Sequence, residues 1–91
     1  MEYFKKLKVI NDLGIHARSS AKIVELAGRH NSKLYLKKDG HEEVDGESIL
    51  SILTMACAKG TEIHARAVGE DSKELLDELS RLFERKFDED K

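Results

Sequence analysis

The tetrapeptide Ile-His-Ala-Arg occurs twice in the chain, at residues 15–18 and 63–66, in two different surroundings. The first copy follows Gly14 and precedes apolar residues at helical spacing, which predicts that His16 lies at or beside the N-cap of a helix. The second copy lies in an alternating strand pattern, which turns His64 to the polar face. Only the first histidine is therefore expected beside the free backbone N–H groups of a helix start.

A histidine at a helix start has a specific chemical use. The positive end of the helix dipole disfavours the imidazolium form, so the His16 ring is expected to be neutral and nucleophilic near pH 7. The N–H groups of the first turn, around Ala17 and Ser19, and the guanidinium of Arg18 suit the oxygens of a phosphoryl group. These residues predict a phosphoryl-accepting site in which the ring nitrogen attacks directly. The alternative is that His16 only caps the helix and Arg18 is solvated.

A second candidate feature is the segment 48–53, Ser-Ile-Leu-Ser-Ile-Leu, which would be apolar nearly all round as a helix. Such a helix is either deeply buried or partly exposed as a docking patch. We expect an exposed patch made of Ile49, Leu50 and Leu53. Ser48 is a good N-cap residue, and a phosphate there would meet the same N–H groups, so Ser48 is also a candidate regulatory phosphorylation site. No metal cluster and no hydrolytic triad is recognisable, and we expect neither a metal nor a cofactor.

The composition fits one small soluble domain. The chain has 91 residues, of which 40% are hydrophobic and 37% charged, and Cys57 is its only cysteine. No apolar run is long enough to span a bilayer or to serve as a signal peptide, so we expect a cytoplasmic protein without membrane insertion. The net charge of −2 argues against nucleic-acid binding. Residues 1–38 carry a charge of +6 and residues 39–91 carry −8, so the basic half suits an anion or an acidic partner.

The elements that must position these residues follow from periodicity and turn signals. Asp71 and Glu74 are spaced like a capping box that opens a third helix. The tail, residues 85–91, is charged and is expected to fray outside a core of about residues 3–84. We expect strands over residues 3–10, 33–37, 41–44 and 61–68, and helices over residues 16–29, 48–58 and from 71 onward, the last with an apolar stripe of Leu75, Leu76, Leu79, Leu82 and Phe83. This order predicts an α+β domain with two layers.

The segment Gly14-Ile15-His16-Ala17-Arg18 resembles the active-site segment of HPr, the histidine-containing phosphocarrier family of the bacterial phosphoenolpyruvate-dependent phosphotransferase system (PTS). The resemblance covers essentially residues 3–84. It implies a single HPr-like domain over residues 1–91, an open-faced two-layer sandwich of order β-α-β-β-α-β-α with four antiparallel strands and three helices on one face. Other segments that fall where the family has them are Gly40, residues 44–53, Lys59-Gly60 and Gly69-Glu70-Asp71.

The resemblance also implies roles for individual residues. His16 would accept a phosphoryl group on Nδ1 from enzyme I and pass it to an EIIA-type domain, while Arg18 would steady the phosphate. Ser48 would match the serine that an HPr kinase/phosphorylase modifies in some bacteria, and Ile49, Leu50 and Leu53 would match the partner-docking patch. The protein would be a phosphohistidine carrier and not a turnover enzyme. A monomer is the expected state for a carrier that must reach several partners.

Two departures from the family concern Ser19, where the family usually has proline, and residues 45–47, which are unusually acidic and flexible. The leading hypothesis is a phosphoryl carrier of sugar transport or of the nitrogen-regulatory branch of the PTS. The alternative is a regulatory binding module that acts through Ser48 and the apolar patch. A two-layer α+β enzyme such as an acylphosphatase ranks lower, because the chain lacks a glycine-rich phosphate loop paired with a catalytic asparagine.

Overall fold

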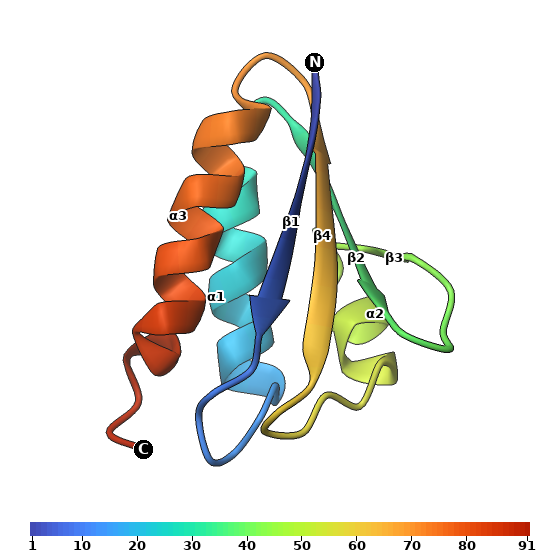
Figure 1. Cartoon of the computed structure of the whole chain (residues 1–91). Coiled ribbons are helices and arrows are strands. Elements are labelled where there is room, and N and C mark those ends of the chain that lie inside the picture. Colours follow the sequence, from blue (N-terminus) through green and yellow to red (C-terminus); the bar gives the residue numbers. More distant parts are fainter.

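The structure, a computed structural model that describes residues 1–91, consists of a four-stranded antiparallel sheet with helices on one face (Figure 1). The strand order is β1-β4-β2-β3, and every neighbouring pair is antiparallel. None of the helices is both long and apolar enough to cross a membrane. The elements in chain order are β1 (Glu2–Lys8), α1 (Ala17–Gly28), β2 (Lys33–Lys38), β3 (Val44–Asp45), α2 (Ile49–Thr54), β4 (Glu62–Val68), α3 (Ser72–Glu84) and the short 3-10 turn η1 (Lys86–Asp88). The predicted α+β class and element order are confirmed.

The central strand β4 shows why the second Ile-His-Ala-Arg copy belongs to the sheet. Ile63, Ala65 and Ala67 are buried, as the alternation predicts. The residues between them lie on the opposite face, where His64 Nε2 is 3.0 Å from Asp39 Oδ1. Arg66 stacks over a tyrosine ring of β2 and pairs with two glutamates on the same face. His64 is therefore part of a solvated ion-pair surface.

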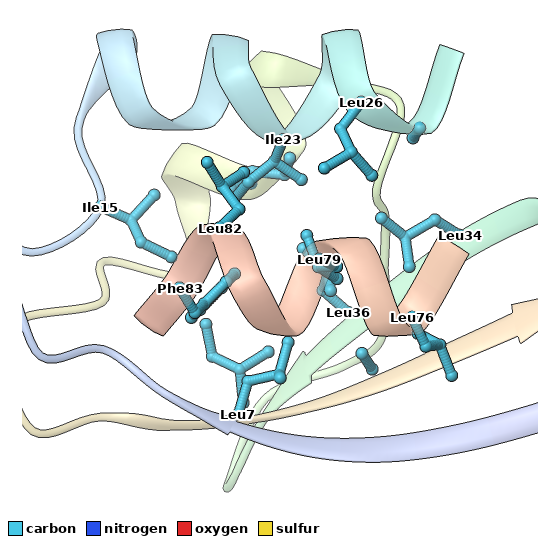
Figure 2. Close-up of a cluster of buried hydrophobic side chains, with 14 of the residues drawn as sticks. Leu7, Ile15, Ile23, Leu26, Leu34, Leu36, Leu76, Leu79, Leu82 and Phe83 are labelled. Atoms are coloured by element: carbon cyan, nitrogen blue, oxygen red, sulfur yellow. The ribbon is translucent and has the colours of Figure 1, made fainter. Parts of the chain in front are cut away.

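The core lies between the sheet and the two long helices. The predicted stripe of α3 is buried throughout. Figure 2 shows Leu76, Leu79, Leu82 and Phe83 of this stripe in one cluster with side chains of α1 and of the strands. Burying such a stripe is what holds an amphipathic helix on a sheet. The residues that meet there include Leu7, Ile15, Ile23, Leu26, Leu34 and Leu36 together with Leu76, Leu79, Leu82 and Phe83.

Three predicted boundaries are wrong. The first strand ends at Lys8 and does not reach residue 10. The strand expected over residues 41–44 is only Val44–Asp45, so the connection between β2 and β3 is longer than expected. The second helix ends at Thr54 and does not reach residue 58. It stops because the chain turns at Ala56, whose φ is +52°, and because Lys38 Nζ donates to the carbonyls of Met55 and Ala56, which therefore need no helical partners.

The capping box predicted at the start of α3 is also absent, although the helix begins where expected. The Asp71 side chain makes no cap hydrogen bond. Its carboxylate instead accepts from the backbone N–H groups of Asn31 and Ser32 and from the Ser32 hydroxyl. These bonds, above all the one from the hydroxyl, lower the pKa of Asp71. The residue thus ties the loop before β2 to α3, a contact between segments far apart in the sequence.

The expectation that the tail frays is wrong as well. Residues 85–91 fold back on the domain, and Phe87 is only 1% exposed. Its ring lies 4.8 Å from that of Phe83, and its carbonyl accepts from Lys22 Nζ at 2.8 Å. The backbone reverses through three consecutive positive φ angles in η1 (Lys86–Asp88). Burial of the Phe87 ring and the hydrogen bond from Lys22 together hold this short charged segment on the domain.

His30, which follows the end of α1, links that helix to α3. Its Nδ1 lies 3.0 Å from the Leu26 carbonyl oxygen and its Nε2 lies 2.9 Å from Glu78 Oε2. Burial opposes protonation of the ring, but the Leu26 carbonyl and the Glu78 carboxylate together outweigh it and raise the pKa of His30. His30 thus contacts the end of α1 through a hydrogen bond to the last turn of the helix.

We expect the free energy of unfolding to fall as the pH rises above about 6.5, because the pKa of His30 is raised in the folded protein. A histidine whose pKa is higher in the folded protein than in the unfolded chain stabilises the folded state. This contribution is complete at pH values below the unfolded pKa, about 6.5, and is lost as the pH rises through the folded pKa. The loss should be about 1 kcal/mol or less, because the Glu78 side chain is partly exposed. Denaturant titrations at several pH values, compared with His30→Gln, provide the measurement. An identical pH dependence in the variant would contradict the assignment.

Candidate functional site

His16 is the N-cap residue of α1, as the sequence predicts. Its backbone is extended, with φ −124° and ψ −173°, and α1 begins at Ala17. The ring nitrogen Nδ1 accepts a hydrogen bond from the backbone N–H of Arg18 at 3.2 Å. The Nδ1 lone pair is therefore turned toward the first turn of the helix, where backbone N–H groups lack helical partners.

Ser19 closes the same cap from the other side. This residue is fully buried, its Oγ accepts from the backbone N–H of His16 at 2.9 Å, and its hydroxyl lies 3.2 Å from the His16 carbonyl oxygen. A proline at this position fits the first turn but has no hydroxyl with which to hold the cap. The Ser19 hydroxyl thus fixes the backbone that carries the His16 ring.

The loop before His16 is held by buried backbone contacts. Gly14 has a φ of +70°, and a Cβ there would lie 2.4 Å from the Cys57 carbonyl oxygen. That same carbonyl accepts from the backbone N–H of Ile15 at 2.8 Å, and the Ile15 side chain is buried. Asn11, also fully buried, donates from Nδ2 to the Gly14 carbonyl at 2.8 Å. A glycine is required because the chain passes another backbone in a left-handed conformation.

The second ring nitrogen of His16 has a partner that sequence reasoning missed. Nε2 lies 2.5 Å from Glu89 Oε2, and the two side chains are 28% and 12% exposed. Because Nδ1 accepts from Arg18, Nε2 is the nitrogen that carries the proton and donates to the carboxylate. Burial opposes ionisation of Glu89, but hydrogen bonds from Asn11 and His16 outweigh it and lower the pKa of Glu89. The only signal for this contact in the sequence is Phe87, the one apolar residue of the charged tail.

Arg18 is exposed, and its guanidinium has no hydrogen-bond partner in the protein. It lines an open groove of about 600 Å³ together with tail residues, Glu89 among them. A flexible cation at the rim of this groove is free to turn to an anion bound at the helix start.

The second candidate feature lies on α2. Ser48 is the N-cap residue, as predicted, and its Oγ accepts from the backbone N–H of Ser51 at 3.2 Å. Ile49 and Leu50 are exposed, Leu50 by 76%, whereas Leu53 is half-buried. Helix α2 therefore presents an apolar surface. It packs against α1, the helix that His16 caps.

Comparison with known proteins identifies the family. The family model described as "PTS HPr component phosphorylation site" matches residues 4–85. The chain belongs to the HPr family. HPr proteins of the PTS are phosphocarriers and not turnover enzymes, and this membership confirms the resemblance seen in the sequence. Glu89 lies outside the matched residues, whereas His16 lies within them.

Curated relatives include both named branches of the family. The chain is 38% identical over 84 residues to the phosphocarrier protein HPr of Pseudomonas aeruginosa, and the match covers 92% of this chain and 93% of that protein. It is 33% identical over 84 residues to the phosphocarrier protein NPr of Escherichia coli, with the same coverage.

Solved structures confirm the HPr-like fold. The crystal structure of HPr-C-His from Thermoanaerobacter tengcongensis has a TM-score of 0.91 at 29% identity and covers 98% of this chain and 99% of that one. The HPr of Bacillus anthracis has a TM-score of 0.82 at 30% identity, covering 88% and 94%.

Proposed function

We propose that His16 accepts a phosphoryl group on Nδ1 from phosphorylated enzyme I, which obtains it from phosphoenolpyruvate, and passes it to an EIIA-type domain. The observation that supports this most is the position of the ring: Nδ1 faces the first turn of α1 and accepts from the backbone N–H of Arg18. The proposal takes residues 1–91 as one domain that works as a monomer, because the site must reach several partners. The single buried thiol, Cys57, is in keeping with a cytoplasmic location.

The transfer needs no separate base. The Nδ1 lone pair forms the N–P bond while the bond between phosphorus and the donor breaks. The N–H of Arg18, which now donates to Nδ1, would turn to a phosphoryl oxygen, beside the N–H groups of Ala17 and Ser19. The helix start supplies partial positive charge where the phosphoryl oxygens would lie.

Arg18→Ala should slow phosphoryl transfer about tenfold to a hundredfold, because a charge-assisted hydrogen bond to the phosphate is lost. The melting temperature should change little, since the side chain is exposed and unpaired. Rapid-quench kinetics with phosphorylated enzyme I measure the rate, and calorimetry measures the melting temperature. Arg29→Ala, at the far end of the same helix, is the control; a large drop in melting temperature for Arg18→Ala alone would contradict the assigned role.

We further propose that Ile49, Leu50 and Leu53 contact the protein partners and that Ser48 is a regulatory phosphorylation site. The exposure of Leu50 supports the docking patch. A phosphate on Ser48 would place two negative charges beside this patch and weaken docking. The same observation favours the second candidate function, a regulatory binding module that acts through α2.

Incubation with phosphoenolpyruvate, enzyme I and then an EIIA-type domain tests the carrier against the binding module. Intact mass should first rise by one acid-labile phosphoryl group and then return to its starting value when the acceptor is added. Running the assay with enzyme I of the sugar branch and of the nitrogen branch in parallel shows which donor is preferred. A folded protein that gains no phosphoryl group from either donor would contradict the carrier.

A further inference from the structure

The segment after α3 brings a carboxylate to the ring of His16. Figure 1 shows the C-terminal segment leaving α3 at the same end of the molecule as the start of α1. Glu89 lies there with Oε2 2.5 Å from His16 Nε2. Its other oxygen, Oε1, accepts from Asn11 Nδ2 at 2.9 Å. Both carboxylate oxygens are thus engaged, one by the ring and one by a buried amide.

We propose that Glu89 is a positioning residue for phosphoryl transfer: its carboxylate holds the Nε2–H of His16, orients Nδ1 as the acceptor, and faces the positive charge of the phosphorylated ring. This inference rests on the proposed function of His16. A carboxylate that fixes the tautomer and orientation of a reactive imidazole is a recurrent arrangement in group-transfer sites.

Asn11 supports the proposal because it connects the carboxylate to the loop before His16. Its side chain is fully buried, and Nδ2 donates both to Glu89 Oε1 and to the Gly14 carbonyl. One amide therefore sets the position of the Glu89 carboxylate and of the backbone that leads into His16. Displacing either group would disturb the other.

The tail is anchored on both sides of Glu89, so the contact with His16 does not depend on a single hydrogen bond. Before it, Phe87 is buried and Asp88 pairs with Arg85 Nε at 3.0 Å and with Lys22 Nζ at 3.4 Å. After it, the Lys91 carbonyl accepts from the backbone N–H of Asp12 at 2.5 Å. These contacts reduce the conformational entropy that Glu89 would lose on meeting the ring.

The transfer step balances without a further reactant. The Nδ1 lone pair forms the N–P bond, and the electron pair of the broken bond leaves with the donor. The ring, still protonated on Nε2, becomes positively charged, and the Glu89 carboxylate faces that charge. When the group passes on, the N–P electron pair returns to Nδ1. The charged groups that line the groove with Glu89 are Asp12, Arg18, Lys22, Asp88, Asp90 and Lys91.

The test compares Glu89→Gln with Glu84→Gln, which makes the same change at an exposed side chain at the end of α3, outside the groove. Rapid-quench transfer from phosphorylated enzyme I should be about tenfold slower in Glu89→Gln, and also in Glu89→Ala, and unchanged in Glu84→Gln. The pH profile for hydrolysis of the phosphoprotein should move to lower pH in Glu89→Gln, because a neutral amide favours the protonated ring less. A purely structural role would not move this profile in a variant with unchanged circular dichroism.

A Glu89→Gln variant that matches Glu84→Gln in both rate and pH profile would overturn the proposal. A faster Glu89→Gln would also overturn it, since the tail would then obstruct the site. Failure of the proposed function itself would give different results. In that case the native protein would accept no phosphoryl group, or His16→Ala would still accept one.

Discussion

His16→Ala is expected to abolish phosphoryl acceptance from enzyme I. The imidazole lone pair faces the first turn of α1, whose N–H groups have no helical carbonyl partners, and alanine leaves nothing to form the N–P bond. The fold should persist, because the side chain is partly exposed and Ser19 still holds the cap backbone. Intact mass after incubation with phosphoenolpyruvate and enzyme I measures the loss.

His64→Ala is the matched control, since it removes a histidine from the same tetrapeptide in a different element. The ring of His64 pairs with Asp39 on the exposed face of β4, away from any helix start. Acceptance should therefore equal that of the native protein. Equal loss in the two variants would show that the helix N-cap is not what makes a histidine reactive here.

Gly14→Ala is expected to destabilise the protein by about 3 kcal/mol, the largest effect on stability of any change considered. Alanine at a φ of +70° is disfavoured by about 1–2 kcal/mol, and its Cβ would lie 2.4 Å from the Cys57 carbonyl oxygen, which adds strain. Because the loop leads into His16, transfer should also slow. Urea unfolding, monitored by circular dichroism, measures the free energy.

Gly28→Ala provides the control for this prediction. Gly28 is the last residue of α1, its φ is negative, and a Cβ there meets nothing within 4 Å. Alanine should leave stability unchanged or raise it slightly, since it has the higher helix propensity. If both glycine variants unfold at the same urea concentration, the close approach of Gly14 to Cys57 is not a determinant of stability.

The parts of the site predictable from the sequence depend on local patterns. The placement of His16 at a helix start required only a glycine turn and the apolar period that follows it. Likewise the alternation around His64 placed that residue on a sheet surface. Ser48 was expected as an N-cap because residue type and position within a few residues decide capping.

The parts that could not be predicted depend on contacts between distant segments. Glu89 reaches His16 across 73 positions of chain, and the path of the tail is set by the packing of Phe87 against Phe83 and by hydrogen bonds to distant residues such as Lys22. Asp71 binds the backbone of residues 31–32 instead of its own helix, although its spacing to Glu74 suits a capping box. Local propensity cannot show which of two competing hydrogen-bond partners a side chain will meet.

The central claim is that Nδ1 of His16 carries the phosphoryl group, and nitrogen–phosphorus coupling in the ¹⁵N-labelled phosphoprotein tests it most directly. The structure predicts phosphorus coupled to Nδ1 of His16 alone, with Nε2 still bearing its proton beside Glu89. Phosphorus coupled to Nε2 of His16, or to either nitrogen of another histidine, would contradict the claim.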